Sequence, residues 1–229
     1  MERLIVWWTR VCEAVRAALE TPEAPQRQEI LEAATHEFVE HGLAGARVEA
    51  IAARTATVKR MIYYYFGSKE GLYLAVLEQA YAGIRTAEMG LDLLVLEPVE
   101  AIRRLVEFTF DYHEANPGFS RLVSIENIHN GAHMARSEPI HGVNQGVIEI
   151  MTAVISKGQQ SGAFRRDVSA LDVHMLISAF CFFRVSNRHT FGLLFNCDLL
   201  EPELRDRHKQ LIIEAVLRAL EPRPEGAAA

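Results

Sequence analysis

Apolar residues recur every three to four positions along most of the chain, which is the spacing of amphipathic α-helices. The pattern predicts a first helix from Leu4 to Leu19, followed by a linker from Thr21 to Pro25 that contains two prolines. Two interpretations of that first helix stay open: it packs on its own subunit, or it reaches a partner subunit. Helical spacing continues to Leu220, so the expected fold class is all-α.

Three shorter helices are predicted between residues 26 and 73. The first ends at Gly42, the second is short, and the third runs from Thr57 to Gly67. The apolar positions of the first two are Ile30, Leu31, Ala34, Phe38 and Val39, then Val48, Ile51 and Ala52. Because the last two helices are short and tightly joined, we expect a helix-turn-helix unit.

The third of these helices has an outer side that suits a DNA groove. Thr57 is its expected N-cap, Gly67 ends it, and Ser68 caps the next helix. The residues expected on its inner face are Ile62, Tyr65 and Phe66. The residues expected to point outward are Lys59, Arg60, Tyr63 and Tyr64. A basic, tyrosine-rich side opposite an apolar side indicates insertion into DNA.

The rest of the chain is predicted to be helical and long. The expected helices are Leu72 to Met89, one that starts at Pro98 and is broken at Asn116, Phe119 to Asn127, Ile140 to Gln160, Asp172 to Phe195, and Pro202 to Leu220. The tail from Pro222 to Ala229 is expected to be disordered.

Composition limits the classes of function. The 229 residues carry a net charge of −6, so the protein as a whole is not a basic nucleic-acid binder. Between Ala50 and Ser68, however, there are three cations and no acid, which is a local basic patch. Three widely separated cysteines, no signal peptide and no membrane-length apolar stretch indicate a cytoplasmic protein.

Residues 27 to 73, about one fifth of the chain, resemble the DNA-binding domain of TetR-type bacterial repressors. The motifs that carry the resemblance are Ile30-Leu31-x-x-Ala34, Phe38-x-x-x-Gly42, Val48-x-x-Ile51-Ala52 and Ile62-Tyr63-Tyr64-Tyr65-Phe66-x-Ser68-Lys69-x-x-Leu72. The sequence departs from the family pattern at Arg47, Ala56 and Val58, where a capping threonine, a turn glycine and a helix-opening serine are usual. The residues expected to contact DNA are Arg47, Thr57, Lys59, Arg60, Tyr63, Tyr64 and Lys69.

The resemblance implies a reader domain at residues 26–72 and an effector domain at residues 73–221 that dimerises and binds a small inducer. The implied function is a repressor that binds a palindromic operator as a dimer and is released by the inducer, with no cofactor. A transcriptional activator or dual regulator of the same fold is the alternative. The dimer seam is expected in the last two helices, at Ala179, Phe182, Phe183, Leu193 and Leu194, unless these residues fill the monomer core.

Aromatic and polar residues of the effector part suggest an inducer site. The expected ligand-binding residues are Phe108, Tyr112, His113, Asn127, His133, Phe182, Arg184 and Arg188. Burial of Arg184 or Arg188 would require an anion. That anion is either Glu126 or another acid of the same subunit, or it is the carboxylate of an organic or aromatic acid that acts as inducer.

Other functions have less support in the sequence. Glu126, His129 and His133 have a spacing that could hold a metal, but Gly131 interrupts them and no fourth ligand is evident, so no metal is expected. No nucleophile–base motif or phosphate loop indicates an enzyme. The negative net charge argues against a nucleoid protein that binds DNA without sequence preference.

Overall fold

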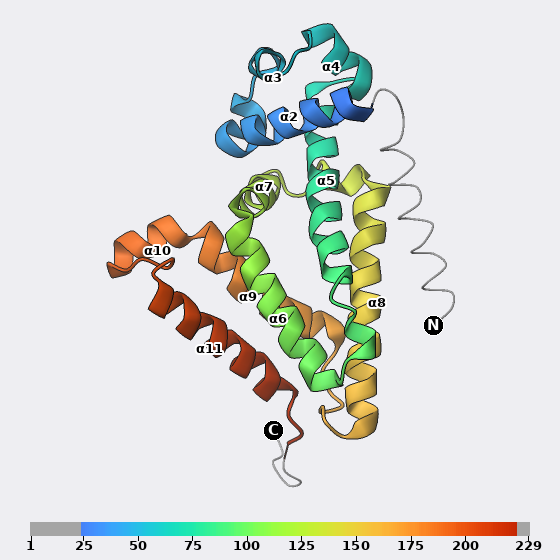
Figure 1. Ribbon diagram of the computed structural model, residues 1–229, viewed down its shortest axis with the longest axis vertical. Helices are drawn as coiled ribbons and strands as arrows, with labels where there is room; N and C mark the ends of the chain where they lie inside the picture. The colour runs from blue at the N-terminus through green and yellow to red at the C-terminus, as the bar shows by residue number, and fades with distance from the viewer. Residues whose placement is uncertain (1–23, 224–229) are drawn as a thin grey trace. The chain divides into compact units, whose positions relative to one another are not determined.

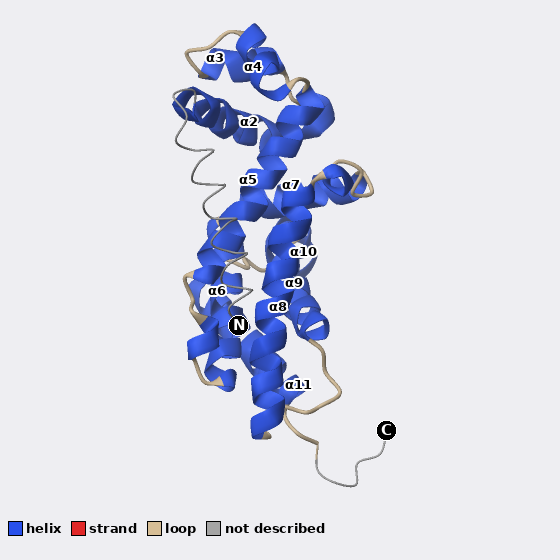
Figure 2. Cartoon of the chain, turned by 90° about the vertical axis from the view of Figure 1, so that its right-hand side faces the viewer, coloured by secondary structure: helices blue, strands red, loops and turns tan. Residues whose placement is uncertain are grey.

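The computed structural model describes residues 24–223, and all the regular elements there are helices (Figures 1 and 2). The all-α expectation is therefore confirmed over this range. The helix predicted from Leu4 to Leu19 and the tail after Arg223 lie outside the described residues. No helix within residues 24–223 is both long enough and apolar enough to cross a bilayer.

The helices follow one another with short connections. In chain order they are α2 (Ala24–Gly45), α3 (Val48–Arg54), α4 (Lys59–Phe66), α5 (Lys69–Met89), η1 (Leu93–Val95), α6 (Pro98–Ala115), α7 (Pro117–Ile128), η2 (Met134–Arg136), α8 (Glu138–Ser161), α9 (Ala170–Ser186), α10 (Arg188–Phe195) and α11 (Pro202–Leu220). They form two compact units, whose described residues are 24–82 with 121–146, and 83–120 with 147–223. The expected boundary between a reader and an effector domain at residue 72 stays a prediction.

The first unit has a core built from the predicted apolar positions. Ile30 and Phe38 of α2, Ile51 of α3 and Ile62 of α4 are all buried, and the Phe38 ring meets Tyr73 of α5 edge-on at 5.1 Å. The expected end of the first helix at Gly42 is a kink rather than an end. Gly42 has φ 67°, a left-handed value that favours glycine, and the helix continues to Gly45.

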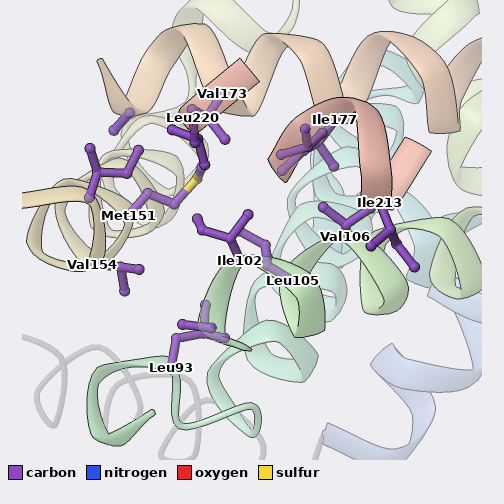
Figure 3. Close-up of a cluster of buried hydrophobic side chains, with 14 of the residues drawn as sticks. Leu93, Ile102, Leu105, Val106, Met151, Val154, Val173, Ile177, Ile213 and Leu220 are labelled. Atoms are coloured by element: carbon purple, nitrogen blue, oxygen red, sulfur yellow. The ribbon is translucent and has the colours of Figure 1, made fainter. Parts of the chain in front are cut away.

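The second unit is built around α6, whose buried face packs against α9 and α11. Figure 3 shows Ile102 of α6, Met151 of α8 and Leu220 of α11 converging on one apolar cluster. The period of 3.6 residues per turn places Ile102, Leu105, Val106 and Phe110 of α6 on one side, and all four are buried there. Packing of this kind supplies most of the stability of a helical domain.

Two boundaries of the stretch predicted from Asp172 to Phe195 differ in the structure. The stretch expected to run from Asp172 to Phe195 is two helices, because Asn187 departs from helical geometry with ψ 6°. The first of them begins at Ala170 rather than Asp172. Ser169 and Asp172 form a reciprocal capping box there, in which each side chain accepts a hydrogen bond from the other residue's backbone N–H. The helix from Pro202 to Leu220 has the predicted limits.

Candidate functional site

The two sides of α4 are as predicted. Ile62 is 1% exposed, and Tyr65 and Phe66 are half-buried against the first unit's core. On the other side, Tyr63 is 38% exposed and Tyr64 is 68% exposed. The inner residues therefore fix the helix to its domain, and the outer ones are free to meet a partner.

The N-terminus of α4 differs from the prediction. The N-cap residue is Val58, which has no side chain able to cap, and Thr57 lies one residue too early. The Thr57 hydroxyl instead accepts a hydrogen bond from Gln26 Nε2 of α2 at 3.4 Å. The expectation that Thr57 caps this helix is therefore wrong, because a threonine caps only when its side chain sits at the residue where helical geometry begins.

The turn between α4 and α5 is as predicted and tightly constrained. Gly67 has φ 74°, and its N–H donates to the Tyr63 carbonyl at 2.8 Å, which ends α4. Ser68 Oγ accepts from the Gly71 N–H at 2.9 Å and caps α5. A Cβ at Gly71 would lie 2.1 Å from the Phe66 carbonyl oxygen, so only glycine fits this close approach. The direction of α4 relative to α5 is fixed by this turn.

The predicted DNA-contacting cations lie at the surface of the first unit. Lys59 pairs with Glu49 of α3, and its Nζ is 5.7 Å from the centre of the Tyr63 ring. Lys69 Nζ donates to the Ala44 carbonyl at 3.3 Å. Arg47 and Arg60 are exposed, and neither is in an ion pair within residues 24–223. Arg47 and Arg60 are therefore the cations most available to bind phosphate.

A buried acid, Glu37, supports this surface and was missed by sequence reasoning. It is 2% exposed and accepts a hydrogen bond at 3.0 Å from the Arg47 N–H, which opens α3. Arg54 approaches the same carboxylate at 3.7 Å. No sequence signal distinguishes Glu37 from the solvent-facing glutamates of the same helix, because its burial depends on how α3 packs on α2.

Four of the predicted ligand-binding residues gather in the second unit. The rings of Phe108 and Tyr112 are 5.5 Å apart, and the His113 ring is 6.2 Å from that of Phe182. His113 Nδ1 is 2.9 Å from the hydroxyl of Ser120. Burial, with a contribution from the positive charge of Arg85, lowers the pKa of His113 to about 4, so its imidazole is neutral at pH 7. This group offers aromatic walls and a neutral hydrogen-bonding ring.

Asn127 and His133 belong to the other compact unit, so the structure does not join them to that group. Glu126 is 2% exposed and accepts hydrogen bonds from the backbone N–H groups of His133 at 2.7 Å and Met134 at 3.0 Å. Its second oxygen is 3.0 Å from His133 Nδ1. Glu126 therefore caps the η2 segment, and it is not the partner of Arg184. Among residues 24–223 no three potential ligands are grouped as a metal site would need.

Arg184 is buried, and its anion belongs to the same subunit. The guanidinium pairs with Glu114 of α6 and donates to the Leu199 carbonyl at 2.9 Å. The Cζ atom of Arg184 also lies 4.5 Å from the centre of the Phe110 ring. Arg184 thus has an anion within its own subunit, and its assignment as a receptor for a ligand carboxylate stays a prediction. Arg188 is only half-buried and contacts His189 at 3.2 Å, so it needs no buried anion.

A second buried ion pair, Arg85 with Glu88 on α5, was missed by sequence reasoning. Each residue is 6% exposed. Burial raises the pKa of Glu88 although Arg85 opposes the change. Burial and the Arg85 charge lower the pKa of His174 to about 4 as well. Residues three apart on a helix usually form a surface pair, so a polar interior could not be recognised here from the sequence.

The residues predicted for the dimer seam do not fill the core of the described chain. Phe183 is 47% exposed, Leu193 85% and Leu194 77%. With Leu171 and Met175, which are 61% and 68% exposed, Phe183 lies on one stripe of α9 at four-residue spacing. The alternative that these residues serve only the monomer core is therefore wrong for Phe183, Leu193 and Leu194.

The chain matches known proteins along most of its length. The profile described as "Bacterial regulatory proteins, tetR family" matches residues 30–76, and that described as "Tetracyclin repressor-like, C-terminal domain" matches residues 98–216. The HTH-type transcriptional repressor NicS of Pseudomonas putida is 36% identical over 194 residues, which cover 85% of this chain and 92% of that protein. The HTH-type transcriptional repressor SCO4008 of Streptomyces coelicolor is 33% identical, covering 71% of this chain and 79% of that protein.

A solved structure gives the same result. The putative transcriptional regulator SCO4942 from Streptomyces coelicolor superposes with a TM-score of 0.64 and 25% identity, covering 87% of this chain and 99% of that one. Its match extends well beyond the helix-turn-helix unit. The chain therefore belongs to the TetR family of bacterial transcriptional regulators.

Proposed function

We propose that the protein binds a palindromic operator as a dimer through two copies of α4 and leaves it when an organic acid binds the second unit. The observation that carries the proposal is α4 itself, with Ile62 buried on one side and Arg60, Tyr63 and Tyr64 exposed on the other. One such helix reads too few base pairs for useful specificity. Two of them, about 34 Å apart, read both halves of a palindrome.

The DNA contacts are proposed at the exposed face of the first unit. The residues are Arg47, Thr57, Lys59, Arg60, Tyr63, Tyr64 and Lys69. Arg60 is the sharpest test, because it is exposed and in no described ion pair. Arg60→Ala should lower the slope of log affinity against log salt by about one, since one phosphate contact is lost.

The matched control for Arg60→Ala is Arg104→Ala, which removes an exposed arginine from α6 in the second unit. It should leave both the affinity and the salt slope unchanged. Both variants should unfold at the wild-type temperature. Equal salt slopes for Arg60→Ala and the wild type would reject Arg60 as a phosphate contact.

The dimer seam is proposed on the exposed stripe of α9, formed by Leu171, Met175, Ala179 and Phe183. An apolar stripe of this length is unusual on the surface of a monomer. Met175→Glu should shift the protein to monomer in size-exclusion chromatography with light scattering, and operator binding should fall with it. Thr152→Glu, at an exposed position of α8, is the control that should stay dimeric. A dimeric Met175→Glu variant would remove this stripe from the seam.

The inducer site is proposed at Phe108, Tyr112, His113 and Phe182, with Arg85 as a further candidate for the cation that binds the carboxylate. The aromatic rings suit a flat ligand, and the buried guanidinium near two neutral imidazoles suits its carboxylate. Arg85 lies on α5, whose N-terminal end begins at the turn after α4. A ligand that draws Arg85 away from Glu88 would therefore act on the helix that carries the recognition helix.

Calorimetry against a panel of aromatic carboxylic acids, each paired with its neutral amide, tests this site. An acid should bind and release operator DNA, and its amide should bind at least tenfold more weakly because it lacks the charge-assisted hydrogen bonds. Phe182→Ala should weaken binding of that acid without changing operator affinity. Equal binding of acid and amide would refute the role of Arg85.

As a regulator of bacterial genes, the protein would act in the cytoplasm. A reporter gene behind the operator distinguishes the two signs of regulation. For a repressor, reporter expression falls when the protein is expressed, whereas the activator alternative predicts that it rises.

A further inference from the structure

Glu49 is the one acidic residue between Arg47 and Lys69, a segment that also holds five cations. It lies in the first turn of α3, and its carboxylate contacts the ammonium of Lys59 at the start of α4. The side chains of Glu49 and Lys59 are 65% and 48% exposed, so both can move to meet DNA. A negative charge thus occupies the middle of the surface that must approach phosphates.

A contribution to the stability of the fold does not explain the ion pair between Glu49 and Lys59. An ion pair between two exposed side chains contributes little to folding and is screened by salt. A glutamate in the first turn of α3 also interacts favourably with the helix dipole, but that contribution does not depend on Lys59. The hydrogen bond and the charge of Lys59, with a smaller contribution from Arg47, lower the pKa of Glu49, so the carboxylate is ionised at neutral pH. Any DNA that approaches therefore meets an anion and a cation that is already neutralised.

Phosphate and base edges respond to that anion in opposite ways. Every phosphate repels a carboxylate, whatever the sequence. In the major groove, however, the amino group of cytosine donates a hydrogen bond, and glutamate is a side chain that accepts it. Glu49 therefore weakens binding to DNA of every sequence by repelling phosphates. Only a site with cytosine at the facing position offsets this repulsion, through the hydrogen bond to the carboxylate.

We propose that Glu49 is a specificity-determining residue, which holds Lys59 away from the phosphates of non-operator DNA and accepts a hydrogen bond from a cytosine amino group in the operator. On the operator, Glu49 turns to the base edge and Lys59 is released to bind phosphate. This inference rests on the proposed operator binding through α4. It adds that the acid beside the recognition helix, as well as the cations on it, selects the sequence.

The experiment uses the full-length protein and two duplexes: the operator selected by the wild type from a random pool, and a random-sequence duplex of the same length. Affinities of the wild type, Glu49→Gln and Glu49→Gln/Lys59→Gln are measured by fluorescence anisotropy over a series of salt concentrations. For Glu49→Gln, binding of the random duplex should tighten by about eightfold at 0.1 M salt, with a slope steeper by about 0.9, because one more phosphate is neutralised. The ratio of operator to random affinity should fall at least as much.

The double variant should return to the wild-type salt slope on the random duplex, because Lys59 is the cation that Glu49→Gln releases. The matched control is Glu100→Gln, which also removes one negative charge and an exposed ion pair, at 3.6 Å from Arg103 in the second unit. It should behave as the wild type. Replacing the facing cytosine in the operator should weaken the wild type more than it weakens Glu49→Gln, because a neutral amide oxygen accepts a weaker hydrogen bond than a carboxylate does.

Two results would overturn the inference and differ from failure of the proposed function. In the first, the wild type selects an operator, but Glu49→Gln binds the random duplex with the same affinity and salt slope as the wild type. The ion pair would then have no part in selectivity. Alternatively, Glu49→Gln and Glu100→Gln change binding equally, which would show an effect of net charge only. If the wild type selects no sequence at all, the proposed operator binding fails and this inference fails with it.

Discussion

Replacing Gly71 with alanine should weaken DNA binding by forcing α4 and α5 apart at their junction. The added Cβ would lie 2.1 Å from the Phe66 carbonyl oxygen, a backbone atom that cannot rotate away. Ordinary contact begins at 3.4 Å, so the two helix ends must separate by roughly 1 Å. Overpacking of this kind costs about 1–3 kcal/mol of stability.

The same displacement carries the outer face of α4 with it. Hydrogen bonds to base edges need close geometry, and each good bidentate contact is worth about 1–3 kcal/mol of discrimination. Loss of a single contact at the lower end of that range weakens operator affinity about fivefold. Affinity for random DNA should change less, because phosphate contacts tolerate small displacements.

Gly83 provides a matched control in the same helix. It is exposed, and a Cβ there would meet the Tyr112 hydroxyl at 3.4 Å, which is ordinary contact. Gly83→Ala should therefore stabilise the protein by up to about 1 kcal/mol through helix propensity. Urea unfolding and fluorescence anisotropy on both variants give the comparison. If Gly71→Ala is as stable and binds as tightly as the wild type, the turn does not set the position of α4.

Three further predictions concern the second unit. Burial holds the pKa of His113 near 4 in the folded state, so the unfolded chain gains its proton first as the pH falls below about 6.5. The free energy of unfolding should therefore fall by about 3 kcal/mol between pH 7 and pH 4 because of this histidine. Urea unfolding of His113→Gln should lack that part of the decline. Glu114→Gln leaves the Arg184 guanidinium buried without its carboxylate, which should cost about 3–5 kcal/mol in urea unfolding at pH 7, and a cost below 1 kcal/mol would show that the pair is solvated. Ser169→Ala removes the cap of α9 and should cost about 1 kcal/mol by the same assay, whereas Ser169→Asp should retain most of the stability.

Local signals made the recognition helix predictable. The burial of Ile62 and the exposure of Tyr64 follow from helical spacing alone. Gly67 and Ser68 mark the turn because left-handed backbone favours glycine and a helix start favours serine. The N-cap was misplaced by one residue, since Thr57 and Val58 can each precede the first helical residue and the choice depends on the contact of Thr57 with Gln26.

The buried ion pairs depend on tertiary packing and could not be predicted from the sequence. Arg184 was correctly expected to need an acid, but Glu126 and Glu114 are both distant in sequence, and only the packing of α6 on α9 brings Glu114 to it. Arg85 and Glu88 could not be singled out from the sequence, because nothing local reveals that this side of α5 is buried. The fold and the exposed side of α4 were therefore largely predictable, whereas the polar interior was not.

Two copies of α4 are proposed to read the two halves of a palindromic operator. Selection of duplexes from a random pool by the purified protein, followed by sequencing, tests it most directly. A dimer with two copies of α4 should enrich an inverted repeat whose half-site centres are about 10 base pairs (one helical turn) apart, or a multiple of that distance. Recovery of no enriched sequence, or of a single site without two-fold symmetry, would contradict it.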